Sequence, residues 1–308
     1  MALATARLAK FFKLELVERG VESVRHNTRY FLTLGVCLIT LMGCSTTPAE
    51  VPPNSSPTPT AIESSATAVM EDYAFYFVAD TARGLRLYKE VQTVDVGENE
   101  LGSDKGLNAL TMLITGQLPP FDGDHKTLWK SGSKVIGISR EGGVATVDLS
   151  LGRFDVGAEA EQRAIDQIVW TLTANDPTVI SVKLTVDGLS VETLAGHVDA
   201  TASFVPGFSY DVLASVGIDQ LDRSDVTSPV VITGMACTFE ANVSWELLQD
   251  KAIIDSGATT AASACPDRSA WQIDLGELAP GKYTIRVFDL SAQDGSVVSE
   301  DDKDFTVN

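Results

Sequence analysis

The sequence predicts an α+β domain followed by an all-β sandwich. Between residues 73 and 186, strand-like runs alternate with two helical patterns. After residue 229 only short strand patterns occur, and turn residues separate them. The length of the chain agrees with this prediction. An apolar segment near the start ends at position 43, and the 265 residues that follow it suit two domains of about 100–150 residues, each with its own core.

The first half of the α+β domain is predicted as two strands and a helix. Residues 73–79 are rich in aromatic side chains and residues 85–91 alternate, as strands do. Residues 103–116 have helical spacing, with Ser103 as the expected N-cap and Gly116 as the expected end. The face that we expect to be buried consists of Leu107, Leu110, Thr111 and Ile114.

The second half is predicted as a hairpin, a helix and a strand. The strands 134–139 and 144–149 flank the turn signal Glu141-Gly142-Gly143, and a further strand at 179–186 ends at Asp187-Gly188. The inward side chains of the second strand are Ala145, Val147 and Leu149. In the helix predicted over 158–173, the core face is Ile165, Ile168, Val169 and Leu172. The polar residues of this helix fall largely outside its core face; they are Glu161, Arg163, Asp166 and Gln167. The order ββαββαβ predicts two helices on one face of a small sheet.

The sandwich is predicted from five short strands, at 229–234, 241–247, 271–275, 282–290 and 303–307. Trp245 and Trp271 are the expected large core residues. Tyr283 lies near the start of a predicted strand in which every second side chain, beginning with Tyr283, is expected to face the core. Its position after Gly281 suggests a tyrosine corner.

The start of the chain has the pattern of an export signal. An apolar run, 31–43, follows Arg25 and Arg29 and is too short to span a bilayer, which takes about 20 apolar residues. Its end, Leu41-Met42-Gly43-Cys44, resembles a bacterial lipobox. We therefore expect a lipoprotein signal peptide at 1–43 and a lipid on Cys44, which would anchor the protein on the extracytoplasmic face of a bacterial cell membrane. The alternative is a buried strand with an incidental cysteine.

Composition separates a tether from the folded part. Residues 45–67 hold five prolines and ten Ser or Thr residues, a composition that cannot bury a core. We expect a tether at 44–68. Removal of the leader, with its six basic residues and three glutamates, takes the net charge from −19 to −22. Such an acidic chain is repelled by phosphate backbones, so we expect no nucleic-acid partner.

Two of the four cysteines lie outside the predicted leader and are not the predicted lipid acceptor. Cys237 and Cys265 form an even pair in a chain predicted to be exported, which is typical of a structural disulfide. The alternative is two free buried thiols.

Two resemblances follow from short motifs. Residues 72–195 resemble the GerMN domain of bacterial sporulation and germination proteins, and residues 216–308 resemble the immunoglobulin-like domain of bacterial spore germination. The motifs of the first are 107–110, 132–135, 143–150, 166–173 and 182–188, and those of the second are 228–234, 239–245, 281–285 and 291–295. The resemblance implies a GerMN-like domain at 69–195, a linker at 196–215 and an immunoglobulin-like sandwich at 216–308. It implies an envelope role and supplies no catalytic residues.

No pattern for chemistry is complete. The segment 276–283 approaches a P-loop, but Tyr283 stands where magnesium needs Ser or Thr, so we expect a turn. The acidic run 300–304 lacks the spacing of a calcium loop and is expected to be solvated. His125 and His197 are expected on the surface, without a nucleophile motif or a zinc spacing nearby. We therefore expect no catalytic residue, metal or cofactor.

These observations favour a non-catalytic envelope lipoprotein that binds a protein or a cell-wall partner such as peptidoglycan. Two alternatives stay open. The first is a regulatory lipoprotein that acts on a membrane sensor kinase. The second is an enzyme that cleaves wall glycan or peptide with paired carboxylates, whose geometry a sequence does not reveal.

Overall fold

The computed structural model describes residues 68–97, 101–219, 221 and 225–308. All of them belong to one compact unit of the chain. The predicted leader, Cys44 and all but the last residue of the predicted tether lie outside the described residues. Among the residues that are described, no helix combines the length and the apolar character needed to cross a bilayer.

The unit begins with a long antiparallel hairpin of β1 (Met70–Thr81) and β2 (Gly84–Asp95). Both strands were predicted, and both are longer than the predicted runs. Tyr73, Phe75 and Phe77 alternate along β1 and are fully buried, which explains why an aromatic-rich run forms a strand here.

Helix α1 (Lys105–Thr115) follows, and its limits correct one prediction. The N-cap is Asp104, whose carboxylate accepts the backbone N–H of Leu107, so the prediction of Ser103 was wrong by one residue. Gly116 ends the helix in the left-handed conformation, as predicted. Of the predicted face, Leu110 and Ile114 are buried, but Leu107 and Thr111 are only partly buried. Ala109, Met112 and Leu113 are buried as well and were not predicted.

A four-stranded sheet comes next, in the order β3-β4-β5-β6. Its strands are β3 (Lys134–Glu141), β4 (Val144–Ser150), β5 (Ser181–Val186) and β6 (Leu189–Ser190). Strands β4 and β5 are parallel, and α2 (Ala158–Asn175) connects them. The predicted inward residues of β4, Ala145, Val147 and Leu149, are fully buried.

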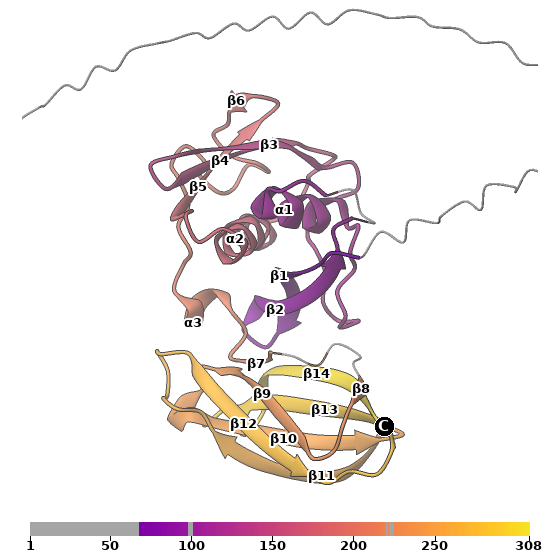
Figure 1. The fold of residues 1–308 in the computed structure, drawn as a ribbon. Helices are drawn as coiled ribbons and strands as arrows, with labels where there is room; N and C mark the ends of the chain where they lie inside the picture. The colour runs from indigo at the N-terminus through magenta and orange to yellow at the C-terminus, as the bar shows by residue number, and fades with distance from the viewer. Residues whose placement is uncertain (1–67, 98–100, 220, 222–224) are drawn as a thin grey trace, which may run out of the picture. The chain divides into compact units, whose positions relative to one another are not determined.

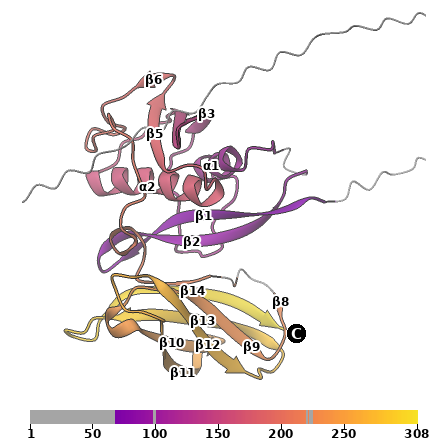
Figure 2. The same cartoon turned by 60° about the vertical axis from the view of Figure 1, so that its left-hand side comes forward.

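The helices lie between the two sheets. Both α1 and α2 contact the β1–β2 hairpin on one side and the four-stranded sheet on the other (Figures 1 and 2). The prediction of helices on one face of one sheet was therefore incomplete, because the first hairpin forms a separate layer.

Helix α2 is buried on more sides than predicted. Its predicted apolar face is buried, but Glu161, Asp166 and Gln167 are buried as well. Glu161 has no exposed surface, and its carboxylate accepts four backbone N–H groups, those of Leu194, Ala195, His197 and Val198. The amide of Gln167 bridges two segments, accepting from the N–H of Leu128 and donating to the carbonyl of Tyr76. The periodicity had placed Glu161 and Gln167 outside the core face of the helix, but in the structure their side chains bond to backbone groups of the protein.

The short helix α3 (Ser209–Val212) leads into a two-sheet sandwich. One sheet has the order β11-β10-β13-β14-β8 and the other β12-β9-β7. The strands are β7 (Val216–Ile218), β8 (Asp225–Val226), β9 (Val230–Ala236), β10 (Asn242–Gln249), β11 (Ala252–Thr260), β12 (Ser269–Gly276), β13 (Gly281–Leu290) and β14 (Val297–Val307). A single turn of 3-10 helix, Phe239–Ala241, precedes β10. All five predicted strands are present, whereas β7, β8 and β11 were not predicted.

The sandwich core confirms most of the predicted residues. Trp271 is buried, and the hydroxyl of Tyr283 donates to the carbonyl of Ala279 at 2.9 Å, which is the hydrogen bond of a tyrosine corner. Trp245 is only partly buried, because its ring lies over Gly257 of the edge strand β11. The sandwich also contains a disulfide between Cys237 and Cys265, whose Cα atoms are 4.6 Å apart.

Candidate functional site

Five charged or titratable side chains meet where the last strand of the sandwich contacts the α+β part. We call them the buried charge cluster: Glu90 of β2, Asp122 and His125 of the segment after α1, and Asp301 and Lys303 of β14. All five side chains are almost completely removed from solvent. Buried charges of this kind persist only when they are paired, so their partners decide what the cluster can do.

Glu90 and His125 form the tightest contact of the cluster. Nδ1 of His125 lies 2.6 Å from Oε1 of Glu90, and Nε2 lies 3.7 Å from Oδ2 of Asp122. Oε2 of Glu90 also accepts the backbone N–H of Phe121 at 2.8 Å. The imidazole lies beside the ring of Tyr88, with 4.6 Å between the ring centroids. Both ring nitrogens therefore face carboxylates.

Lys303 joins the sandwich to the other half of the cluster. Its Nζ donates to Oδ1 of Asp301 at 2.9 Å and to Oδ2 of Asp122 at 3.2 Å. Oδ2 of Asp301 in turn accepts the backbone N–H of Ile218 on β7. A single ammonium group thus bridges carboxylates that are 179 positions apart in the sequence.

The neighbouring Tyr88 extends the same junction. Its hydroxyl lies 3.0 Å from Oγ of Ser299 and donates to the carbonyl of Glu300 at 2.8 Å. Burial raises the pKa of Tyr88, so the phenol stays protonated and available as a donor at neutral pH.

Strand periodicity places these groups. On β14 the odd-numbered residues from Ser299 to Val307 are buried, so Asp301 and Lys303 share the inward side of the strand with Phe305. On β2 the even-numbered residues from Tyr88 to Val94, which include Glu90, are buried in the same way.

The pKa values in the cluster follow from burial and charge. Burial acts to raise the pKa of Glu90 and Asp122, but contacts with His125 and the nearby Lys303 outweigh it and lower both. Burial acts to lower the pKa of Lys303, and the charges of Asp301 and Asp122 outweigh it, so this pKa is raised. The lysine is therefore charged at neutral pH and stabilises two carboxylates.

Asp302 has the opposite shift. Burial, together with the charges of Asp122 and Asp301, raises the pKa of Asp302 to about 6. It lines a small polar hollow of about 160 Å³ with Asp122 and Asp304. Carboxylate oxygens of Asp122, Asp124 and Asp302 lie within 4.8 Å of one another.

Two sequence predictions about these residues were wrong. His125 was expected on the surface but is only 6 % exposed, whereas His197 is exposed as predicted. The run 300–304 was expected to be solvated, yet Asp301 and Lys303 are buried. The sequence contained one indication of this burial. Lys303 interrupts the acidic run and lies two positions from both Asp301 and Phe305, so the three side chains share one face of a strand.

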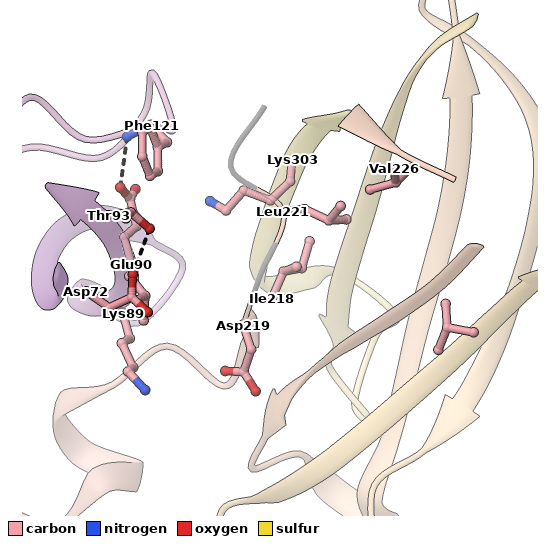
Figure 3. Close-up of a pocket in the computed structure, with 12 residues that line it drawn as sticks. Asp72, Lys89, Glu90, Thr93, Phe121, Ile218, Asp219, Leu221, Val226 and Lys303 are labelled. Atoms are coloured by element: carbon pink, nitrogen blue, oxygen red, sulfur yellow. Dashed lines mark hydrogen bonds between the residues drawn. The ribbon is translucent and has the colours of Figure 1, made fainter. Parts of the chain in front are cut away.

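A pocket of about 320 Å³ lies next to the cluster (Figure 3). On one side Figure 3 shows Asp72, Lys89, Glu90, Thr93 and Phe121, and on the other Ile218, Asp219, Leu221, Val226 and Lys303. The first side is largely polar, and the second is largely apolar apart from Asp219 and the Lys303 ammonium. The pocket therefore presents one surface for hydrogen bonding and one for apolar contact.

The cluster is suited to holding elements together. Each ring nitrogen of His125 faces a carboxylate, so the imidazole is not directed at a substrate. Asp122, His125 and Asp301 have the spacing of metal ligands, but the ammonium of Lys303 already bonds to both aspartates and supplies the positive charge there. The P-loop-like segment 276–283 runs from the end of β12 through a short connection into the start of β13, as expected of a turn.

This fold defines a class of two-part protein, an α+β domain followed by an immunoglobulin-like sandwich. Residues 74–192 match the family described as "Sporulation and spore germination", and residues 221–296 match the "Immunoglobulin-like domain of bacterial spore germination". The chain therefore contains these two domains in this order, in agreement with the resemblances found in its sequence. Neither description is that of an enzyme family.

Solved structures give weaker similarities. A candidate lipoprotein from Clostridium perfringens has 22 % identity and a TM-score of 0.30, with 46 % of this chain and 91 % of that chain covered. The tandem GerMN domains of the sporulation protein GerM from Bacillus subtilis have 14 % identity and a TM-score of 0.37, with 68 % and 63 % covered. The first GerMN domain of GerM has 19 % identity and a TM-score of 0.33, with 44 % and 96 % covered. Similarities of this size carry no argument about function. A comparison with curated proteins found no match.

Proposed function

We propose that the protein is a non-catalytic lipoprotein of the bacterial cell envelope. In this proposal a lipid on Cys44 holds it outside the cytoplasmic membrane, and its two germination-type domains act as one binding unit for a protein or cell-wall partner. The buried charge cluster is the observation that carries the proposal. Its charges bond to each other across the two domains, which supports a role in joining them rather than in chemistry.

The anchor is tested by Cys44→Ala. We expect this variant to lose the membrane association of the wild-type protein and the mass of the attached lipid, measured by fractionation and intact-mass spectrometry. Cys37→Ala, in the same predicted leader, is the matched control and should still be lipidated. Unchanged membrane retention and mass of Cys44→Ala would contradict the proposal.

Partner binding is tested separately. The lipidated protein, crosslinked at the cell surface, should capture a specific envelope protein or remain bound to isolated peptidoglycan. The same capture with Lys303→Met, which breaks the cluster, should be reduced. Absence of capture by both routes would refute the proposed binding role.

One observation favours a second candidate function. Asp122 and Asp302 line the same polar hollow, their carboxylate oxygens are close, and their pKa values are shifted in opposite directions. Such a pair has the general requirements of a carboxylate-dependent hydrolase. Release of soluble fragments from purified peptidoglycan by the wild-type protein, and its loss in Asp302→Asn, would favour this enzyme over the binding protein.

A further inference from the structure

The register of the first hairpin determines which backbone groups of β2 point away from β1. The backbone groups of Ala74 and Tyr76 on β1 bond to side chains of α2, and those of Val78 bond to Lys126. These β1 residues are paired with Val91, Lys89 and Leu87 of β2. Because hydrogen bonds alternate along an antiparallel pair, the odd-numbered residues of β2 direct their N–H and C=O groups outward.

Part of this outward edge is already paired. The N–H of Leu85 donates to Glu159, and its carbonyl accepts from Arg163. The carbonyl of Leu87 accepts the N–H of Ala214, in a short parallel bridge. Beyond this point, within the described residues, no hydrogen bond involves the backbone of Lys89, Val91 or Thr93. In the part of the chain that the structure describes, the edge of β2 is therefore open over 89–93.

The open edge lines the 320 Å³ pocket. Lys89, Val91 and Thr93 belong to its lining, which also includes the apolar side chains of Ile218, Val226 and Val231. Figure 3 shows Lys89 and Thr93 on one side and Ile218 and Val226 on the other. Val231 is about half exposed and Val226 is partly exposed, whereas Ile218 is buried, so Val226 and Val231 are the apolar residues that a ligand could reach. An open strand edge next to an apolar surface has the features that bind an extended peptide by strand addition.

Charge indicates the kind of peptide. The pocket lining carries three carboxylates, Asp72, Glu90 and Asp219, against the ammonium groups of Lys89 and Lys303. The whole chain has a net charge of −19, which also favours a basic partner. A basic side chain on the peptide would balance the excess carboxylate.

We propose that the edge of β2 at Lys89, Val91 and Thr93 binds an extended segment of a protein partner in which apolar and basic side chains alternate. The segment would add as a strand to β2, place its apolar side chains against Val226 and Val231, and direct a basic side chain to Asp219. This inference rests on the proposed binding function and names the partner's chemistry.

The test uses the full chain and a fluorescent peptide with the sequence Val-Lys-Val-Thr-Val-Lys. We expect saturable binding by fluorescence polarisation that weakens as salt increases. Bound peptide should slow amide hydrogen exchange at Lys89, Val91 and Thr93, and leave Glu90 and Gln92 unchanged because these already bond to β1. A peptide with Glu in place of Lys should bind at least about 10-fold more weakly.

Variants and a modified peptide isolate the strand pairing. Val91→Pro removes an outward N–H without removing a hydrogen bond to β1, and should weaken binding at least about 10-fold. Val91→Ala keeps the N–H and should bind within about 2-fold of wild type. Asp219→Asn should weaken binding about 5-fold. An N-methylated peptide that cannot donate to β2 should fail to bind the wild-type chain, which tests the idea even if Val91→Pro does not fold.

Equal binding of the methylated and unmethylated peptides, or no binding of the basic peptide at 1 mM, would overturn this inference. These outcomes are distinct from failure of the proposed function. A protein that still captures its envelope partner with Val91→Pro in place retains the proposed function but does not use this edge.

Discussion

Replacing Lys303 with methionine tests the energetic role of the buried charge cluster. Methionine keeps an unbranched apolar chain and removes the ammonium group. Nζ of Lys303 contacts Asp301 at 2.9 Å and Asp122 at 3.2 Å, and the lysine side chain is only 7 % exposed. The variant therefore leaves two carboxylates without their compensating charge where solvent has little access. Removing one partner of a buried ion pair typically costs about 3–5 kcal/mol.

Urea unfolding at pH 7 measures this loss directly. For a folded part of roughly 240 residues, each kcal/mol lowers Tm by about 2–4 °C, so calorimetry should show a decrease of about 6–20 °C. Lys282→Met is the matched control, because Lys282 is exposed on the neighbouring strand β13 and has no ion pair in the described part of the chain. We expect this control to change the free energy of unfolding by less than about 0.5 kcal/mol.

A second variant separates charge from packing. If uncompensated charge is the cause, Asp301→Asn should recover part of the stability lost in Lys303→Met, because one carboxylate is then neutral. A loss in Lys303→Met no larger than in Lys282→Met would refute the reasoning. Failure of Asp301→Asn to recover any stability would attribute the loss to packing instead.

Three further predictions concern other buried groups. Glu161→Gln should lower the free energy of unfolding by about 2–4 kcal/mol and speed proteolysis at 194–198, because an amide cannot accept all four N–H groups that the carboxylate accepts; unchanged proteolysis would contradict this. The raised pKa of Asp302, about 6, means that the folded chain binds more protons than the unfolded chain between about pH 4 and 6, so stability falls as pH rises through this window. Asp302→Asn should therefore stabilise by about 1 kcal/mol at pH 7, after allowance for solvent screening, and by nothing near pH 3; an equal effect at both pH values would exclude this cause. Replacing Cys237 and Cys265 together by serine should cost about 3–3.5 kcal/mol for a 28-residue loop, and the wild-type pair should react with a thiol reagent only after reduction; immediate labelling would rule out the bridge.

Much of the fold could be predicted because local patterns and tertiary structure agree. The alternation at Ala145, Val147 and Leu149 and the turn at Pro280-Gly281 produce the expected strand and connection. Strand β11 was not predicted because its pairing with a neighbouring strand, and not its own sequence pattern, makes this segment a strand. Gly257 and neighbouring small polar residues weaken its pattern, and β10 supplies the pairing.

The candidate site could not be predicted because its members are distant in sequence. Periodicity treats a charged side chain as solvent-facing, but Glu161 is buried against backbone N–H groups and Lys303 against carboxylates. His125 lies in a segment rich in Gly and Asp, which is typical of an exposed loop, and its contacts with Glu90 and with the ring of Tyr88 explain its burial. Such compensation depends on which elements meet, and single-sequence patterns contain no such information.

The pocket beside the open edge of β2 depends on the buried charge cluster. Glu90 of β2 belongs to the cluster, while the odd-numbered residues Lys89 and Val91 line the pocket. Lys303 belongs to both, since it bonds to Asp122 and also lines the pocket. The distance between β2 and the apolar surface on the sandwich therefore depends on an intact cluster. Lys303→Met should weaken peptide binding even where the chain remains folded, whereas Lys282→Met should not, and equal binding by the two variants would show that the pocket forms without the cluster.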